Sequence, residues 1–191
     1  MEIIVRKAKD ADREDIAYCI SEAFEKDFSI LCKNIKTTAK AICSGIMTDK
    51  FYVAEHNNEI IGTLAVSDCN GRAVITDRTS YKRNFGFIKG MIACIVLKEE
   101  FESKLAYPIT TGYLEFVSVK KDYRRMGIAT ALIKESLRLS EYTDYVLDVT
   151  DINTSAINCY TKLGFSEFKR IKEKHGKQKG FNEKIYMKYK K

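Results

Sequence analysis

The sequence predicts a single domain of the α/β class. Its 191 residues suit one domain with a buried core of its own. Apolar runs of strand length occur along the whole chain, and segments whose apolar residues recur at helical spacing stand between them. No repeat, low-complexity stretch or Pro/Gly-rich linker interrupts this order. We therefore expect one domain over residues 1–191, with a sheet flanked by helices.

The chain opens with a predicted strand and helix. Residues 2–7 are β-rich, and the acidic segment 10–14 supplies an N-cap and a first turn. Ile16, Ile20 and Phe24 then recur at helical spacing.

A second helix and a hairpin are expected next. The helix covers 34–46 and ends near Gly45. Two β-rich runs, 51–55 and 60–67, flank His56-Asn-Asn-Glu59, and asparagines at such a position favour a tight hairpin turn.

The long segment 68–112 has a less regular pattern. Its predicted parts are a turn at 68–71, a short strand at 72–76, a helix within 84–104 and a loop from Pro108 to Gly112.

Strands and helices alternate again in the last part of the chain. The predicted elements are strands at 113–119 and 145–149, helices at 129–140 and 154–163, and two final strands at 165–172 and 184–189 joined by a polar loop at 175–180. Gly164 follows the second helix at a position where glycine commonly ends a helix.

The chain is basic, with 33 Lys and Arg against 26 Asp and Glu. This balance permits an acidic partner such as a phosphorylated cofactor or nucleic acid. However, the lysines are spread along the whole chain and aromatic residues do not gather on a basic face. A solvated surface therefore explains the charge, and nucleic acid is not the expected partner.

Cysteine and histidine usage indicates neither a metal site nor disulfides. None of the six cysteines forms a CxxC pair, and His56 and His175 are far apart in sequence. Unpaired cysteines fit a reducing cytoplasm, and the N-terminus lacks an apolar run typical of a signal peptide.

The longest apolar run, 85–97, contains Lys89 and is too short to span a bilayer, so we expect no membrane partner. It contains the GxxxG of Gly86 and Gly90, which favours a packed or self-associating helix.

The most informative stretch is 117–133, which reads as a strand, a basic turn with glycine, and a helix start. Its centre, Arg124-Arg-Met-Gly-Ile-Ala129, matches neither GxGxxG nor GxxxxGK[ST]. Gly127 permits an unusual backbone conformation or a close ligand approach. The free N–H groups of such a turn, at the positive end of a helix dipole, favour a phosphate or pyrophosphate. The alternative is a plain strand–turn–helix with two surface arginines.

A second motif, Asn153-Thr-Ser-Ala-Ile-Asn-Cys-Tyr-Thr-Lys-Leu-Gly-Phe165, follows one strand later. Together the two motifs, over roughly residues 114–165, resemble the GNAT superfamily of acetyl-CoA-dependent N-acetyltransferases. The order of the flanking elements also fits this superfamily over almost the whole chain. One departure is that Lys120 and Lys121 stand where the family motif often has proline.

The resemblance implies a GNAT fold, with a central mixed, mostly antiparallel sheet splayed between two adjacent parallel strands, 113–119 and 145–149. Acetyl-CoA, as co-substrate, would lie in this opening. The implied cofactor-binding residues are Val117, Ser118 and Val119 for the pantetheine arm, Arg124, Arg125, Met126, Gly127, Ile128, Ala129 and Thr130 for the pyrophosphate, and Asn153 and Tyr160. For Asn153 the alternative is an N-cap of the helix at 154–163.

The resemblance also implies the catalytic groups. The N–H of Val117 would stabilise the oxyanion of a tetrahedral intermediate, and Tyr160 would protonate the leaving thiolate. The alternative for Tyr160 is a packed aromatic with its hydroxyl at the surface.

The candidate general base is Glu115, which by strand alternation shares a face with Val117 and Val119. Its alternatives are a substrate-amine anchor or an exposed strand carboxylate, and a water molecule could serve as base in its place. Three further acids could line the acceptor pocket: Glu22, Glu25 and Asp27.

The expected reaction is acetyl transfer to a primary amine of a small molecule or a protein. The family usually joins the strands around 68–112 by a short turn, so this insert is expected to shape substrate choice or a homodimer contact. The alternative function is a non-catalytic acyl-CoA sensor or a basic nucleic-acid-associated module.

Overall fold

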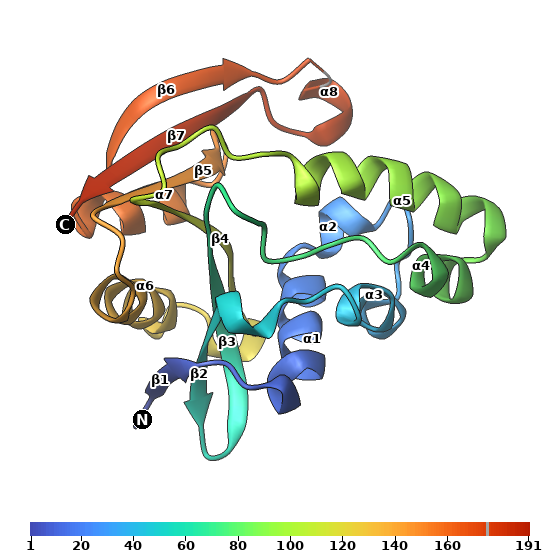
Figure 1. Ribbon diagram of the computed structural model, residues 1–191, viewed down its shortest axis with the longest axis horizontal. Coiled ribbons are helices and arrows are strands. Elements are labelled where there is room, and N and C mark those ends of the chain that lie inside the picture. The colour runs from blue at the N-terminus through green and yellow to red at the C-terminus, as the bar shows by residue number, and fades with distance from the viewer. Residues whose placement is uncertain (175) are drawn as a thin grey trace.

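The computed structural model describes residues 1–174 and 176–191, and the fold is built on one mixed sheet (Figure 1). Over these residues the sheet has seven strands in the order β1-β2-β3-β4-β5-β7-β6. The strands are β1 (Ile4–Lys7), β2 (Phe51–His56), β3 (Glu59–Ser67), β4 (Thr111–Val119), β5 (Asp144–Thr150), β6 (Ser166–Lys172) and β7 (Glu183–Lys190). Every neighbouring pair is antiparallel except β4 and β5, which are parallel. The predicted mixed, mostly antiparallel α/β fold is confirmed.

Helices cover both faces of the sheet. They are α1 (Arg13–Ala23), α2 (Glu25–Phe28), α3 (Ile35–Cys43), α4 (Arg78–Phe85), α5 (Phe87–Glu102), α6 (Ile128–Leu139), α7 (Thr154–Lys162) and α8 (Gly176–Lys179). In Figure 1, α1, α3, α4 and α5 lie on one side of the central strands and α6 lies on the other. The four-residue α2 has no counterpart among the helices that the sequence predicts.

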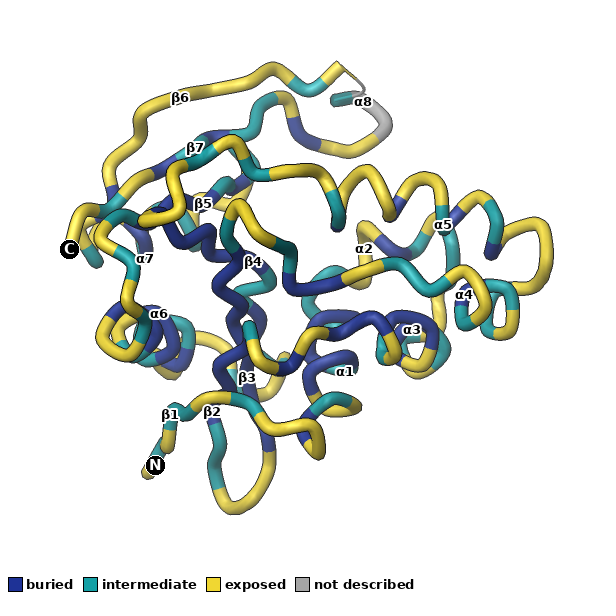
Figure 2. Tube along the Cα trace, in the orientation of Figure 1, coloured by how far each residue is buried: buried dark blue, intermediate teal, exposed yellow. Residues whose placement is uncertain are grey.

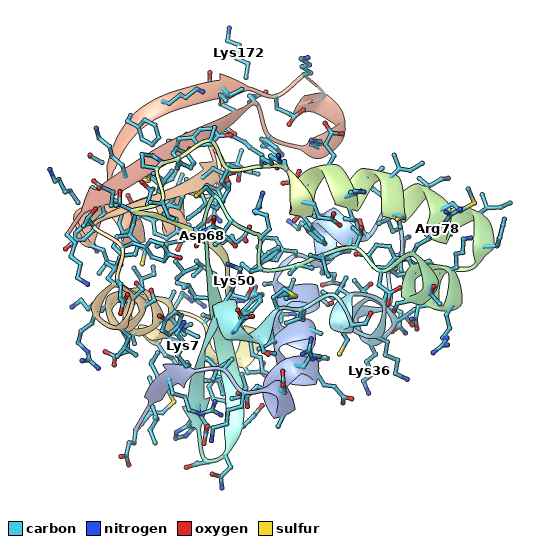
Figure 3. The ribbon with its side chains drawn as sticks, viewed as in Figure 1. Lys7, Lys36, Lys50, Asp68, Arg78 and Lys172 are labelled. Carbon is cyan, nitrogen blue, oxygen red and sulfur yellow. The ribbon has the colours of Figure 1, made fainter. Side chains whose placement is uncertain are left out.

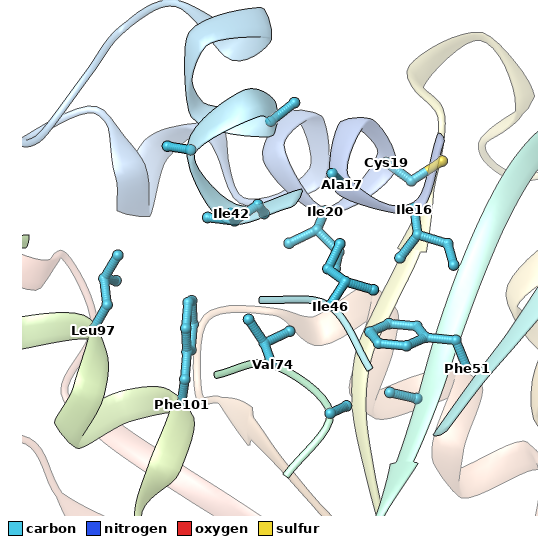
Figure 4. Close-up of a cluster of buried hydrophobic side chains, with 14 of the residues drawn as sticks. Ile16, Ala17, Cys19, Ile20, Ile42, Ile46, Phe51, Val74, Leu97 and Phe101 are labelled. Atoms are coloured by element: carbon cyan, nitrogen blue, oxygen red, sulfur yellow. The ribbon is translucent and has the colours of Figure 1, made fainter. Parts of the chain in front are cut away.

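Strand alternation divides the core into two clusters, one on each face of the sheet. Phe51 and Val53 of β2 pack with helices α1, α3 and α5, whereas Tyr52 and Ala54 pack with α6. Figure 4 shows the first cluster, in which Phe51 faces Ile16 and Ile46. Figure 2 shows that burial concentrates in the central strands, while β6 is exposed along its length.

Local chemistry explains several element boundaries. The β2–β3 turn holds Asn57 and Asn58 at φ of 49° and 61°, the left-handed region that asparagine tolerates, so the predicted hairpin is confirmed. The side chains of Asn34 and Asp77 accept backbone N–H groups at the first turns of α3 and α4.

The insert contains two helices rather than the single helix predicted within 84–104. Gly86, at φ of 85°, ends α4 and begins α5, so the chain turns there. The two helices pack closely, because a Cβ on Gly90 would lie 2.6 Å from the Lys82 backbone. The strand predicted at 72–76 is also wrong: only Val74 forms a bridge, to Ile46.

The predicted polar loop at 175–180 contains α8, and His175 itself lies outside the described residues. Within the part of the chain that is described, no helix is long and apolar enough to cross a membrane. Figure 3 shows the labelled Lys7, Lys36, Arg78 and Lys172 on widely separated parts of the surface, which agrees with basic charge that is spread rather than gathered.

Candidate active site

The strands β4 and β5 separate after a short parallel contact. Residues 111–113 of β4 pair with 144–146 of β5, and the register goes no further. β4 nevertheless continues to Val119, paired to β3 on its other side, and β5 remains paired to β7. In Figure 1 the group β5, β7 and β6 runs at an angle to the strands β2 to β4. The edge of β4 from residue 114 onward is therefore open to an extended ligand.

A β-bulge lies on this open stretch. Phe116 has φ of 53°, and the register to β3 passes from Glu115 to Ser118, which leaves Phe116 and Val117 without β3 partners. A phenylalanine in the left-handed region is strained, and surrounding packing must hold it there. Three rings do so, at centroid distances of 6.1 Å (Phe24), 6.3 Å (Phe51) and 5.5 Å (Phe101).

The bulge overturns the predicted alternation of Glu115, Val117 and Val119. Val117 and Val119 pack on the α6 side of the sheet, whereas Glu115 bonds to Arg72 and Ala73 on the opposite side. The extra residue shifts the strand by one position, so the side chains after Phe116 exchange faces. Glu115 and the two valines therefore face opposite sides.

The turn between β4 and α6 has the backbone of an anion site. Arg125 and Gly127 have φ of 64° and 82°, and Gly127 is the N-cap of α6. Among the described residues no side chain caps this helix start, so the first N–H groups of α6 are available to a ligand. A Cβ on Gly127 would meet nothing within 4 Å, so its conformation, rather than internal crowding, favours glycine. Arg124 Nε donates a hydrogen bond to the Val119 carbonyl oxygen at 3.2 Å, which connects the turn to the end of β4.

The second motif lies beside this turn. The Asn153 side chain accepts the Ala156 N–H at 3.2 Å, so the N-cap alternative is confirmed for Asn153. Thr130 Oγ1 on α6 lies 3.5 Å from Cys159 Sγ on α7. The two motifs predicted to share a ligand are therefore neighbours in space.

Tyr160 lies on α7 and is 8% exposed. Its ring packs against Phe165 with centroids 6.0 Å apart. Burial, with smaller contributions from Cys159 and Asp148, raises the pKa of the phenol above its usual value. The hydroxyl is therefore protonated at neutral pH and is available as a donor.

Glu115 is tied into an ion pair with the insert. Its carboxylate accepts Arg72 Nε at 3.0 Å and the Ala73 N–H at 3.1 Å, and it also accepts the Ser67 hydroxyl. The side chains of Glu115 and Arg72 are 7% and 12% exposed. These donors already occupy the acceptor positions of the Glu115 carboxylate and fix its orientation. Glu115 is therefore a poor candidate for taking a proton from a substrate.

A cavity of about 510 Å³ opens on the Glu115 side of the separated strands. Its rings come from Phe24, Phe101, Tyr107, Tyr113, Phe116, Phe168 and Tyr186. Among the described residues that line it, Phe24 represents the first helical region, and the predicted Glu22, Glu25 and Asp27 are not included. Glu22 instead accepts the Lys121 N–H at 2.7 Å. The acids at the cavity wall are Glu99, Glu100, Glu115 and Asp148.

Asp148 is the acid that the sequence reading missed. It lies on β5 where the strands have separated, accepts the Tyr113 hydroxyl and lies 3.4 Å from Lys184 Nζ. Lys184 also contacts Glu100 of α5 at 3.1 Å. Burial lowers the pKa of Lys184, but Asp148 and Glu100 outweigh this effect, so the net shift is upward. A charged residue in the apolar run 145–149 was the available signal.

Comparisons with known proteins give one consistent result. The family model described as "Acetyltransferase (GNAT) family" matches residues 20–165. An N-acetyltransferase from Staphylococcus aureus Mu50 superposes with a TM-score of 0.65 at 16% identity, covering 97% of this chain and 100% of that one. A ribosomal-protein-alanine N-acetyltransferase from Brucella melitensis gives 0.59 at 15% identity, covering 98% and 99%. At these identities the two structures show the shared fold.

Curated relatives match over shorter segments. An N-alpha-acetyltransferase of Sulfurisphaera tokodaii is 35% identical over 68 residues, which are 34% of this chain and 41% of that protein. N-alpha-acetyltransferase 30 of Homo sapiens is 31% identical over 83 residues, 42% of this chain and 22% of that protein. The matches thus span less than half the length of these relatives.

Proposed function

The chain belongs to the acetyltransferase (GNAT) family and is an acyltransferase, and from this premise we propose that it moves the acetyl group of acetyl-CoA to the α-amino group of a peptide or protein. The observation that carries the proposal is the arrangement around β4. Leu114, Glu115 and Phe116 of this strand line the aromatic cavity that contains Asp148, and the strand then continues with an edge open on the β5 side toward the start of α6.

Acetyl-CoA fits this path by charge and by shape. The turn from Arg124 to Thr130 offers backbone N–H groups at a helix N-terminus, which suit a pyrophosphate. The edge of β4 at Val117, Ser118 and Val119 lacks a strand on the β5 side, so the pantetheine arm can pair there. Asn153 begins α7 on the same side and is proposed to contact the arm in addition to capping the helix.

The proposed chemistry needs three groups. Asp148, which still has acceptor capacity, binds the substrate ammonium and takes its proton directly or through water. The neutral amine then attacks the thioester carbonyl, and the Val117 N–H in the bulge stabilises the oxyanion. As the intermediate collapses, the attacking nitrogen loses its second proton to water and Tyr160 donates a proton to the leaving thiolate. Tyr160 and Asp148 then return to their starting protonation states by exchange with solvent. Glu115 is assigned a positioning role through Arg72 instead of the role of base.

An α-amine suits this site better than a lysine. The pKa of an α-amine is about 7.7–8.0 and that of lysine about 10.4, so at neutral pH the reactive neutral fraction differs roughly several-hundred-fold. One carboxylate beside Lys184 provides little additional driving force for deprotonating a lysine. The names of the relatives, N-alpha-acetyltransferases, support the same acceptor.

The cellular setting is also part of the proposal. The six cysteines are free and none is paired in a disulfide. Free thiols in this number are typical of a reducing compartment, and we place the reaction in the cytoplasm.

The test is acetyl transfer from acetyl-CoA to matched peptides, read by mass spectrometry. One peptide has a free N-terminus and no lysine, and the second has a blocked N-terminus and one internal lysine. A polyamine and a free amino acid complete the panel. We expect acetylation of the free N-terminus alone. CoA binding by calorimetry without transfer to any amine would favour the acyl-CoA sensor, and transfer to lysine or polyamine alone would overturn the α-amine assignment.

A further inference from the structure

Residues 87–97 of helix α5 are apolar except for Lys89, yet only one side of this stretch is buried. Gly90, Ala93, Leu97 and Phe101 face the interior. On the opposite side five large apolar side chains are more than half exposed, namely Phe87 (67%), Ile88 (73%), Ile92 (51%), Ile95 (72%) and Val96 (55%). We call these five residues the α5 patch. Figure 2 shows the exposed outer side of α5 at the edge of the molecule.

The α5 patch is distinct from the contacts that hold the insert together. Gly90 of the GxxxG faces α4, where a Cβ would meet the Lys82 backbone at 2.6 Å, so this motif is used inside the chain. Ile88, Ile92 and Ile95 are spaced four and three residues apart, which places them in one row along the helix. A helix that is apolar on all sides is normally buried on all sides. The row therefore lacks its packing partner.

We propose that the α5 patch binds the α5 patch of a second copy of this chain, with the two helices antiparallel. The charges favour this direction. Lys89 is exposed near the N-terminal end of the helix, and Arg83 is exposed on the adjoining α4. Near the C-terminal end Lys98, Glu99 and Glu100 are exposed, so the charge there is negative on balance. Antiparallel pairing brings opposite charges and opposite helix dipole ends together, whereas parallel pairing opposes like charges.

The size of the patch fits a modest dimer. It exposes on the order of 500 Å² of apolar surface per copy, compared with about 800 Å² per partner in a standard interface. Polar residues at the rim, among them Lys89 and Glu99, supply the remainder. We expect a dissociation constant on the order of micromolar. A membrane surface fits less well, because the acids at the C-terminal end would meet anionic lipid.

The first test is sedimentation of the full chain from about 1 to 100 µM, a range that brackets the expected constant. Wild type should change from monomer to dimer. Ile92→Lys and Ile95→Lys should weaken the dimer at least tenfold while the circular dichroism spectrum stays unchanged. Ile171→Lys, on the exposed strand β6, is the matched control and should dimerise like wild type. A wild type that stays monomeric, or a dimer that Ile92→Lys leaves intact, overturns the proposal.

The second test is a charge exchange that reports on direction. Lys89→Glu and Glu99→Lys should each weaken the dimer several-fold, and the double variant should recover, because the two positions meet only between copies. If the double variant instead weakens the dimer by the sum of the two single effects, the antiparallel arrangement is excluded. Cosedimentation with vesicles of phosphatidylcholine and phosphatidylserine completes the experiment, and vesicle binding by a monomeric wild type would identify the patch as a membrane contact.

Discussion

Arg72 Nε lies 3.0 Å from Glu115 Oε2, so the first residues of the insert are locked to the middle of β4. The pair is largely buried, and Glu115 precedes the bulge residue Phe116 directly. An ion pair in this position holds the β4 backbone where the thioester is proposed to lie. It also explains why an acid on the strand entering the site need not be the base.

We expect Glu115→Gln to lower stability more than it changes chemistry. Removal of one partner from a buried pair costs about 3–5 kcal/mol, because it leaves the other charge uncompensated. Denaturant unfolding should show this loss, and Arg72→Met combined with Glu115→Gln should recover part of it. The pH profile of kcat/KM should keep its wild-type shape. A profile that loses its acidic limb in Glu115→Gln would instead identify Glu115 as the base.

Asp148→Asn should lower kcat/KM for a free N-terminal peptide by roughly 10²–10⁴-fold, the range typical for loss of a general base. The amide keeps the size of the side chain but removes the negative charge that is proposed to bind the ammonium. Asp144→Asn, at the start of the same strand, is the matched control and should keep wild-type activity. Equal losses in the two variants would mean that the strand, rather than the carboxylate in the cavity, is responsible.

Tyr160→Phe should reduce kcat by about tenfold or more and leave KM for the peptide unchanged, because a proton donor to the leaving group acts after binding. The loss should shrink with an acetyl thioester whose thiol has a lower pKa, since that thiolate leaves without help. Tyr189→Phe is a suitable control, because Tyr189 also packs against Phe165, with centroids 5.3 Å apart. A Tyr160→Phe enzyme with wild-type kcat would reduce Tyr160 to a packed aromatic.

Gly127 and Gly86 form a matched pair for testing the anion turn. Both begin a helix, both have positive φ (82° and 85°), and a Cβ on either would meet nothing within 4 Å. Their ψ angles differ, because Gly127 at 3° is in the left-handed helical region, whereas Gly86 at 164° is in a region almost exclusive to glycine. Alanine should therefore lower stability by about 1–2 kcal/mol at Gly127 and by at least as much at Gly86. Gly127→Ala alone should also raise KM for acetyl-CoA, because it disturbs the N–H groups proposed to hold the pyrophosphate. If Gly86→Ala raises KM equally, the effect is general destabilisation.

The sequence was sufficient for the parts of the fold that depend on local pattern. The β-rich runs 51–55 and 60–67 and the asparagines between them predicted the β2–β3 hairpin, and Asn153 at a helix start predicted a cap. The bulge at Phe116 has no such signal, because phenylalanine does not favour positive φ. Packing of Phe24, Phe51 and Phe101 around it, from three distant segments, decides the conformation. The error in the face of Glu115 follows from this bulge.

The acetyl-CoA side of the candidate site stays a prediction from the sequence, and the acceptor side could not be proposed from the sequence in the same detail. The residues proposed to bind acetyl-CoA belong to two contiguous sequence motifs. The acceptor cavity instead brings together residues from distant elements, namely Asp148 of β5, Lys184 of β7 and Glu100 of α5. These residues meet only because β4 and β5 are parallel neighbours that separate, a property of the assembled sheet. The charge of Asp148 within an apolar strand was visible, but its partners were not.

The N-terminal segment should make stability depend on acid pH. Asp12 accepts Arg6 Nη1 at 2.7 Å and the Lys9 N–H at 2.7 Å, and it is buried. The hydrogen bond from Arg6, which outweighs burial, holds the pKa of Asp12 below its usual value. A lowered folded-state pKa contributes stability above the unfolded pKa of about 3.9, and this contribution is lost as the pH falls through the folded pKa.

Asp12→Asn should therefore reduce the free energy of unfolding at pH 7 and flatten its decline below pH 4. The measurement is urea unfolding from pH 7 down to about pH 2.5, compared with Asp15→Asn on the exposed side of α1. A wild-type decline that Asp12→Asn leaves unchanged would assign the acid sensitivity to other carboxylates.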